Sequence, residues 1–271
     1  MVHSGPLQNL ATALALTTKT HPSMRIATWN LRRPGRPTSE RGKALLRRIQ
    51  EIDPDIWVLT ETRESMIPDG GYVGTATSGS DRKQSPGEQW TMIWSRLPVL
   101  SQEPTADPIR TVCVRVATKH SGNMLVYGTV LPWRSDDRWL PNRGAEAFLY
   151  ALQGQENDWR RLRQKYPQDV LCVAGDFNQD LGPRLYTGTA LGRTGLRNSL
   201  SNVALHCLTG EEADPVAELT ANVRRNIDHI CLDSRFGASS DVRRGAWPNT
   251  ASELKGLSDH FGVWVDVDEL T

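Results

Sequence analysis

Polar side chains stand at or beside the ends of several apolar runs, and their types are those that bind metal ions and phosphate. They are Asn30, Glu61, Asp176, Asn178, Asp228 and the pair Asp259-His260. An aspartate that follows a single strand is usually a turn former or a helix cap. Several such residues at strand ends are harder to explain by turn chemistry. Because strand ends hold side chains rigidly at one rim of a sheet, we expect these residues to form one site.

Three of these residues are candidate metal ligands. Mg²⁺ prefers hard oxygen ligands and is usually held by one or two carboxylates together with a phosphate of the substrate. Glu61 is the first candidate, Asp259 is the second, and Asn30 would complete the shell through its amide oxygen. A metal ion there would polarise the phosphoryl oxygen and stabilise charge in the transition state. The residue types therefore predict Mg²⁺-dependent cleavage of a phosphoester, with Mn²⁺ able to substitute.

The remaining strand-end residues suit the handling of water and phosphate. Asp176 can orient or deprotonate the attacking water, and Asn178 can donate from its amide to a phosphate oxygen. A carboxylate beside His260 would fix its tautomer and favour its charged form, and Asp228 is the natural neighbour. His229 follows Asp228 directly, so in an extended strand it should point to the opposite face and pack there.

The apolar runs that would position these residues are mostly strands, with a few helices between groups of strands. Patterns of alternation predict strands over residues 24–30, 56–61, 89–95, 112–118, 124–131, 170–174, 226–232 and 261–267. Helical periodicity predicts one helix from about Thr38 or Ser39 and another over about 144–165, which Gly154 would interrupt. Residues 62–88 are predicted as a surface excursion and residues 180–225 as a long irregular segment. Such an order suits two packed sheets flanked by helices.

Composition and charge describe an ordinary globular chain of 271 residues. Its formal net charge is +1, so a nucleic-acid partner would need a local basic face. The four cysteines show no CxxC spacing, which argues against a disulfide framework or a zinc site. No apolar run is long enough to cross a bilayer, and residues 1–23 form an extension without a convincing signal peptide. We therefore expect one catalytic domain over residues 24–271 and a cytoplasmic location.

Five short motifs occur in the order in which one hydrolase family presents them. They are ATWN (27–30), LTET (59–62), AGDFN (174–178), NIDHI (226–230) and LSDHFGV (257–263), with MIWSRLPVL (92–100) as a weaker match. The sequence resembles the endonuclease/exonuclease/phosphatase superfamily over about residues 24–267. The resemblance implies an α/β fold, a four-layer α-β-β-α sandwich with two mainly antiparallel sheets inside. It also implies the residue roles argued above, with Asp259 at the metal or just behind it.

One position departs from the family's pattern. The family usually places a His or Tyr, which donates to the scissile phosphate, two residues before a Leu/Val-Pro turn, and Val130 stands there. Valine cannot donate a hydrogen bond, and losing one preorganised donor costs about two orders of magnitude in rate when nothing replaces it. Arg134 and Arg143 are candidate replacements, because guanidinium groups suit phosphate. That both are solvated loop residues is an equally weighted alternative.

Two more residues are candidates for contact with the substrate. Arg32 directly follows the strand that ends at Asn30, so it would border the cleft and contact a phosphate backbone. Trp133 lies in a polar loop and would stack on a base or sugar. A role as a local hydrophobic plug is at least as plausible for this tryptophan.

The sequence supports two hypotheses of different classes. The leading one is a Mg²⁺-dependent phosphodiesterase or nuclease acting on DNA or RNA, ahead of a phosphomonoesterase or a lipid-headgroup phosphodiesterase of the same superfamily. The other is a binding module on the same scaffold with little turnover, which only Val130 supports. Its argument is weakened because a non-catalytic scaffold need not keep Glu61, Asp176, Asn178, Asp259 and His260.

Overall fold

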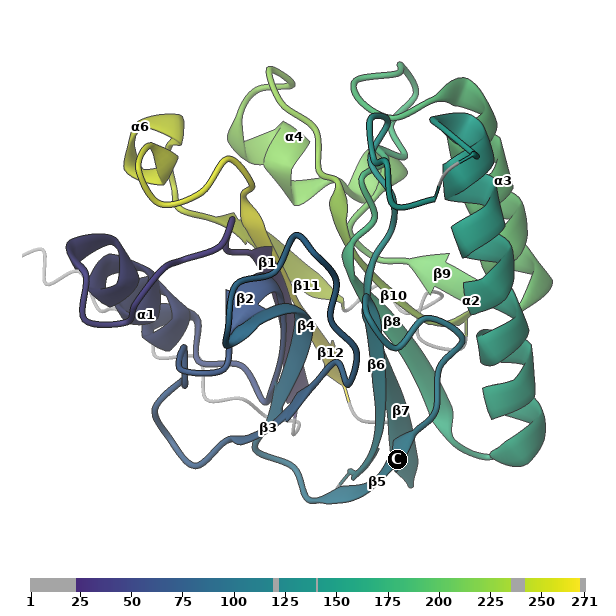
Figure 1. Ribbon diagram of the computed structural model, residues 1–271, viewed down its shortest axis with the longest axis horizontal. Coiled ribbons are helices and arrows are strands. Elements are labelled where there is room, and N and C mark those ends of the chain that lie inside the picture. Colours follow the sequence, from purple (N-terminus) through teal and green to yellow (C-terminus); the bar gives the residue numbers. More distant parts are fainter. Residues whose placement is uncertain (1–22, 119–121, 140, 235–241, 269–271) are drawn as a thin grey trace, which may run out of the picture.

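The computed structural model describes residues 23–118, 122–139, 141–234 and 242–268. Of the predicted N-terminal extension, only Ser23 lies within the described residues, and it begins the first strand. Two six-stranded sheets pack face to face, with α1 outside one sheet and α2 and α3 outside the other (Figure 1). The predicted α/β class and the four-layer sandwich are confirmed.

The first sheet contains both ends of the described chain. Its strand order is β11 (Arg243–Trp247), β12 (Gly262–Asp268), β1 (Ser23–Asn30), β2 (Ile56–Arg63), β4 (Glu88–Ser95) and β3 (Val73–Ala76). Only β1 and β2 pair in parallel, and the other neighbours are antiparallel. A parallel pair needs a crossover connection, which α1 (Glu40–Ile52) supplies with Ser39 as its N-cap.

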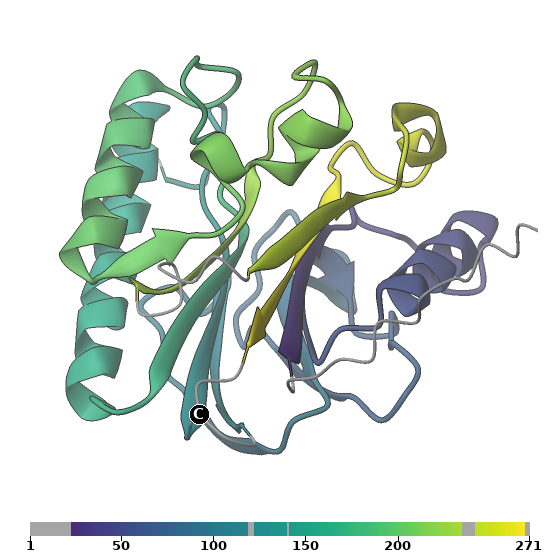
Figure 2. The same ribbon diagram turned by 180° about the vertical axis from the view of Figure 1, so that it is seen from behind.

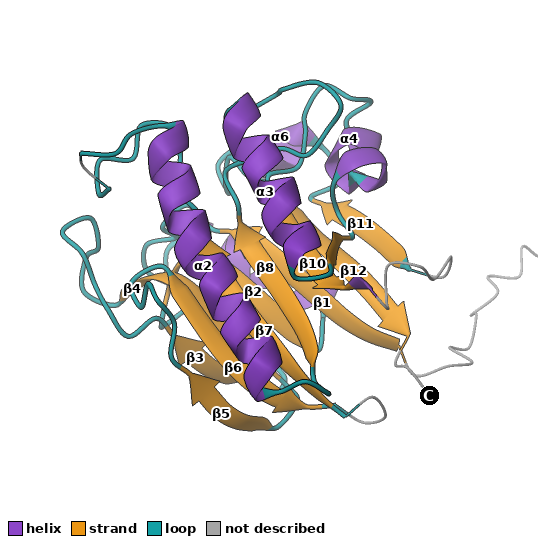
Figure 3. Ribbon diagram, turned by 90° about the vertical axis from the view of Figure 1, so that its right-hand side faces the viewer, coloured by secondary structure: helices purple, strands orange, loops and turns teal. Residues whose placement is uncertain are grey.

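The second sheet repeats this plan. Its order is β5 (Val99–Glu103), β6 (Thr111–Ala117), β7 (Asn123–Val130), β8 (Val170–Asp176), β10 (Asp228–Asp233) and β9 (Leu205–Cys207). The central β7–β8 pair is parallel, and α2 (Ala145–Lys165) makes the crossover. Figure 3 shows α2 and α3 (Ala190–Asn202) crossing the outer face of this sheet.

Alternating side chains of the central strands supply three apolar layers. Ile26 and Val58 of the first sheet meet Val126 and Ile230 of the second in the layer between the sheets. The residues next in sequence point outward, as Trp57 does toward the core under α1. A third layer lies between the second sheet and its helices. Strands buried on both faces explain the nearly continuous apolar runs of the sequence.

Several elements differ from the sequence-based expectations. The predicted surface excursion at 62–88 contains β3, and the predicted irregular segment at 180–225 contains α3, β9, the 3-10 turn η1 (Glu211–Ala213) and the short helix α4 (Pro215–Leu219). Strands β5 and β11 and the short helix α6 (Ala251–Leu254) were also not predicted. Gly154 does not interrupt α2. None of the helices in the described ranges combines the length and apolarity needed to span a bilayer.

The weak periodicity of α3 has a packing reason. Two of its positions are glycines that lie against α2 or the loop after β8. A Cβ on Gly195 would stand 2.3 Å from Leu149 Cδ2, and a Cβ on Gly192 would stand 2.9 Å from Gln179 Oε1. These glycines allow a close approach and lower the helical signal, since glycine is a poor helix former.

Candidate active site

The predicted site residues meet at one rim of the sandwich. The carboxyl ends of β1 and β2 and the amino end of β12 share that rim in the first sheet, because β1 is parallel to β2 and antiparallel to β12. In the second sheet Asp176, at the end of β8, faces Asp228, at the start of β10. Figure 2 shows these strands from behind. The polar residues at or near these strand ends therefore lie together at one rim, as expected.

Asn30 joins the two sheets at this rim. Its amide nitrogen donates to Asp176 Oδ2 at 2.9 Å and to Glu61 Oε1 at 3.2 Å. Its amide oxygen accepts the backbone N–H of Arg32 at 2.8 Å. In this orientation the nitrogen, and not the oxygen, faces the carboxylates, so the metal-ligand role of Asn30 stays a prediction.

Asn178 holds the Asp176 carboxylate from the other side. Its backbone N–H donates to Asp176 Oδ1 at 2.9 Å, and its amide nitrogen donates to Asp176 Oδ2 and to the carbonyl of Leu131, both at 3.0 Å. The turn has a left-handed Asn178 with φ 51°, a conformation that asparagine tolerates better than most residues. Both amide hydrogens of Asn178 are engaged, so its predicted donation to phosphate would require one of these bonds to break.

His260 is fixed by its ring and by its backbone. Nδ1 lies 2.6 Å from Asp228 Oδ2, as predicted for the orienting carboxylate. The backbone N–H of His260 donates to Ser258 Oγ, whose hydroxyl donates to the carbonyl of Asn30 at 2.7 Å. The His260 carbonyl accepts from Trp29 Nε1 at 2.8 Å. The loop before β12 is thereby tied to the end of β1.

Burial and neighbouring charges shift the pKa values of both central groups. Burial raises the pKa of Asp176 to about 7, and the charges of Asp228 and Glu61 add to this while His260 opposes it. For His260, burial lowers the pKa, but the Asp228 and Asp176 carboxylates outweigh it and raise the pKa to about 10. Near neutral pH, His260 is therefore an imidazolium beside a carboxyl that exchanges its proton readily.

The donor set fits a divalent cation. Carboxylate oxygens of Asp176 and Asp228 and a ring nitrogen of His260 lie within 4.8 Å of one another, and while His260 is an imidazolium the two carboxylates are the members of this group that can ligate a cation. Asp228 Oδ1 is buried and has no hydrogen-bond partner among the described residues, and such an unsatisfied oxygen suits a cation or a bound donor. Glu61 adds a partly exposed carboxylate through Asn30. Carboxylate oxygens are the ligands that hard divalent ions prefer.

The other predicted residues lie nearer the surface. Asp259 is 55% exposed, and its Oδ2 is 3.5 Å from Nε of the exposed Arg32. Arg134 and Arg143 are exposed, and neither contacts the cluster through any hydrogen bond or ion pair in the described part of the chain. Their substrate roles stay predictions.

Val130 and Trp133 lie in the chain after β7. Val130 is 1% exposed and pairs in register with Asp176, so no donor replaces the family's His or Tyr at this position. The Trp133 ring packs 6.0 Å from that of Trp90 and 5.0 Å from the buried guanidinium of Arg110. This packing agrees with the alternative in which Trp133 is a local hydrophobic plug of its loop.

Two further residues, Arg33 and Ser258, contact residues of the cluster, and sequence reasoning assigned no role at the site to Ser258. The backbone N–H of Arg33 donates to the Glu61 carbonyl at 2.8 Å, and its Nε is 3.7 Å from the Glu61 carboxylate. Ser258 lies within the LSDHFGV motif, which was the available signal. His229 packs on the opposite face, where Phe177 contacts its ring edge to face and Nε2 lies 2.9 Å from the Gln179 carbonyl.

This fold and this rim define a known class of protein. The chain belongs to the endonuclease/exonuclease/phosphatase family, whose model matches residues 27–260. Members of this family are generally hydrolytic phosphoesterases and typically depend on a divalent metal. A comparison with curated proteins gave no match.

Solved structures show the same fold at low identity. The catalytic domain of APE2 from Xenopus laevis is similar with a TM-score of 0.66 and 16% identity, over 90% of this chain and 92% of that one. The AP endonuclease LMAP from Leishmania major gives 0.63 and 16%, over 92% and 88%. The catalytic domain of human Nocturnin, with bound sulfate anion, gives 0.61 and 18%, over 92% and 96%.

Proposed function

We propose that this protein is a Mg²⁺-dependent phosphodiesterase that hydrolyses nucleic acid. The observation that carries the proposal is the buried cluster in which Asn30 links Asp176 to Glu61 while Asp228 orients His260. Endonucleases among the solved structures of similar fold support the nucleic-acid branch. We further propose that residues 24–271 form one catalytic domain, since both sheets contribute to the cluster. The cytoplasmic location stays a prediction.

In this proposal, one group of side chains activates the attacking water and another binds a phosphate oxygen. Asp176, with a pKa of about 7, takes a proton from water as the water oxygen attacks phosphorus. Asn30 and Asn178 hold that carboxylate in position. His260, held as an imidazolium by Asp228, donates a hydrogen bond from Nε2 to a phosphate oxygen. The P–O ester bond then breaks, and the leaving oxygen takes a proton from solvent water, while Asp176 releases to solvent the proton that it accepted. A bound Mg²⁺ would supply Lewis-acid stabilisation of the phosphoryl charge.

Hydrolysis of bis-p-nitrophenyl phosphate tests this proposal. We expect turnover with Mg²⁺ or Mn²⁺, none with EDTA, and a loss of at least about 100-fold in Glu61→Gln. Glu64→Gln is the matched control, because the exposed Glu64 follows the same strand and, in the described part of the chain, its carboxylate accepts a side-chain hydrogen bond from Gln89 and from no residue of the cluster. Turnover that ignores EDTA, or no turnover on any phosphoester, would refute the proposal. Nicking of plasmid DNA compared with phosphate release from monoesters separates the phosphodiesterase from a phosphomonoesterase.

The second candidate is a binding module with little turnover. The buried valine at position 130 favours it, because the cluster lacks the donor usual at that place. In that case the hydrolysis assay would show no turnover, and calorimetric titration with inorganic phosphate would show metal-dependent binding. The exposed arginines 134 and 143 are then the first groups to test for compensation.

A further inference from the structure

Two cysteines lie directly opposite each other on the antiparallel strands β9 and β10. Cys207 ends β9 and pairs in register with Cys231 of β10. The backbone N–H of Leu208 donates to the carbonyl of Ile230 at 2.9 Å, so the ladder bonds flank the two cysteines and do not join them. A pair of this kind holds its Cα atoms about 4.5 Å apart, with both side chains on one face of the sheet. That spacing falls within the range of about 4.4–6.8 Å that a disulfide needs.

The two thiols differ in their access to solvent. Cys231 is 0% exposed and lies in the apolar layer between the second sheet and its helices. Cys207 is only partly buried, and it lines a groove of about 670 Å³ whose other walls come from α3 and η1. A small reagent can therefore reach Cys207 from the groove, whereas Cys231 can be reached only through Cys207.

The surroundings of Cys207 also favour its thiolate. Burial raises the pKa of this thiol, but a hydrogen bond with Cys231 and the charge and hydrogen bond of the His229 ring outweigh it and hold the pKa of Cys207 below its ordinary value. Burial and the hydrogen bond with Cys207 raise the pKa of Cys231. The thiolate is the nucleophile in thiol–disulfide exchange, so Cys207 is the attacking sulfur and Cys231 the one that follows.

The other two cysteines lack this arrangement. All four cysteines are free thiols in the structure. Cys113 and Cys172 are each 0% exposed, and burial raises the pKa of both, that of Cys172 to about 12. Neither is paired in register with another cysteine on its neighbouring strands. They are therefore internal controls for the reactivity of Cys207.

We propose that Cys207 and Cys231 form a modification site for low-molecular-weight disulfides such as oxidised glutathione. The Cys207 thiolate attacks one sulfur of the reagent, which forms a mixed disulfide and releases one small thiolate. That thiolate takes up from solvent the proton that Cys207 had lost. Cys231 then gives up its proton, its sulfur attacks the Cys207 sulfur, and the second small thiol leaves with a proton. The protein loses two hydrogen atoms and gains a disulfide, while the reagent is reduced to two thiols.

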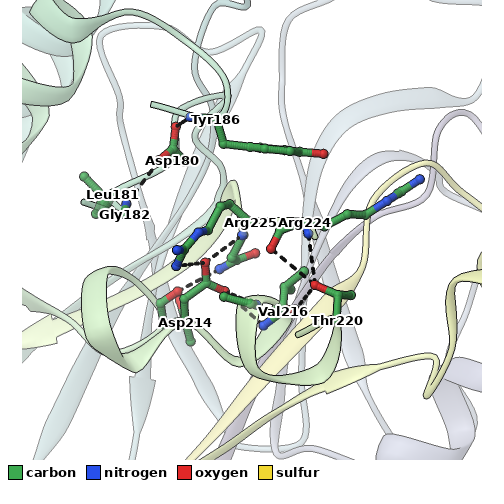
Figure 4. Close-up of polar contacts among 12 residues, drawn as sticks. Asp180, Leu181, Gly182, Tyr186, Asp214, Val216, Thr220, Arg224 and Arg225 are labelled. Carbon is green, nitrogen blue, oxygen red and sulfur yellow. Dashed lines mark hydrogen bonds and ion pairs between the residues drawn. The ribbon is translucent and has the colours of Figure 1, made fainter. Parts of the chain in front are cut away.

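The cross-link would close a loop of the chain over residues 207–231. This loop supplies Arg224 and Asn226 to the wall of the cavity beside His260. Its inner part is already braced, because the Asp214 side chain caps α4 and accepts the backbone N–H of Asn226, and Thr220 Oγ1 accepts that of Arg224 (Figure 4). Its base is held less firmly, since β9 is a three-residue strand at the edge of the sheet. A disulfide at the base would prevent β9 from detaching from β10.

Thiol mapping of the full chain tests the proposal. Reduced protein is incubated with oxidised glutathione near neutral pH, then alkylated in denaturant, digested and analysed by mass spectrometry. We expect two of the four cysteines to escape alkylation, joined in one Cys207–Cys231 peptide pair, and dithiothreitol to restore all four thiols. Cys113 and Cys172 should be alkylated throughout.

Variants separate the two chemical steps. Cys231→Ala removes the second sulfur, so the reaction should stop with one glutathione on Cys207. In Cys207→Ser, modification of the buried Cys231 should be at least about tenfold slower. Cys113→Ala is the matched control and should behave as wild type. Full alkylation of wild type, a disulfide that involves Cys113 or Cys172, or a lasting glutathione adduct on wild-type Cys207 would overturn the proposal.

Amide hydrogen exchange measures the effect of the cross-link on β9. The Leu208 amide should exchange at least about tenfold more slowly in the oxidised protein than in the reduced one. The edge strand β3 lies in the other sheet and should exchange equally in both forms. An unchanged rate at Leu208 would overturn the inferred effect on β9. None of these measurements needs turnover, so their outcome does not depend on the proposed function.

Discussion

Asp176 and His260 share one buried environment, yet burial acts on them in opposite directions. It disfavours the charged form of each, which raises the pKa of the carboxyl and lowers that of the imidazole. Two carboxylates then reverse the effect on His260, whose ring they hold protonated. One group thus exchanges a proton near pH 7 while the other keeps its proton, a division that suits a base and a hydrogen-bond donor.

Stability should report the protonation of His260 directly. Its folded-state pKa of about 10 lies above the unfolded value near 6.5. A raised pKa means that the stabilising interaction of the protonated ring, chiefly with Asp228, is fully present below pH 6.5 and is lost as pH rises through 10. In urea unfolding with EDTA, the stability lost in His260→Gln should therefore be largest near pH 6 and shrink toward pH 10.

The exposed His206 on β9 provides the control, because His206→Gln should show no such trend. A His260→Gln deficit that stayed constant between pH 6 and pH 10 would show that the ring is not protonated in the folded state.

At the scale of elements, the turn after β8 is the most constrained part of the rim. Gly175 has φ +140°, and a Cβ there would stand 2.0 Å from the carbonyl oxygen of Thr129 on the paired strand β7. Only glycine allows β7 to approach β8 at this point, just before Asp176. The glycine of AGDFN is therefore a structural requirement of the site.

Gly175→Ala should cost at least about 2 kcal/mol of stability, because strain of about 1–3 kcal/mol adds to a clash with backbone that cannot move freely. Turnover should also fall, since the strand shift would displace Asp176. Gly154→Ala is the opposite control: the nearest atom to a new Cβ on this helical glycine is Ala106 Cβ at 3.8 Å. Alanine there should stabilise by roughly 0.5–1 kcal/mol. Chemical denaturation of both variants measures the two changes in unfolding free energy, and equal changes would contradict the prediction.

At the scale of the whole molecule, the site depends on the packing of the two sheets. Asn30 and Glu61 come from one sheet, Asp176 and Asp228 from the other, and His260 from the loop before β12. A ligand that binds this rim contacts side chains of both sheets. The unfolded chain does not hold these side chains together, so it lacks the binding site. Its binding must therefore stabilise the fold.

Mg²⁺ should raise the free energy of unfolding relative to EDTA, by about 2.7 kcal/mol at a concentration 100 times the Kd. Thermal or urea unfolding measures this shift in unfolding free energy. The control is the same buffer without divalent cations, adjusted to equal ionic strength. Glu61→Gln should abolish it. If the shift survives in Glu61→Gln but disappears in Asp176→Asn, the metal binds the Asp176 and Asp228 carboxylates and not Glu61.

Much of the fold and of the rim could be predicted from the chain. The strands of the core are buried on both faces, so their apolar runs are visible without any neighbour. The polar residues that follow them are adjacent in sequence to those runs, which locates Asn30, Glu61 and Asp176 at strand ends. The edge strands β3 and β11 escaped prediction because they are partly exposed, as Val73 and Arg243 are, and lack that pattern.

The sequence by itself thus determined which residues can do chemistry and in which elements they stand, because local periodicity and motif order are properties of the chain. Only the tertiary structure decided the orientation of the Asn30 amide and the placement of Asp176 beside His260. Those depend on contacts between residues far apart in sequence, such as Asn30 and Asp176, which lie 146 positions apart. Burial by both sheets then sets the pKa values, and no single segment contains that information.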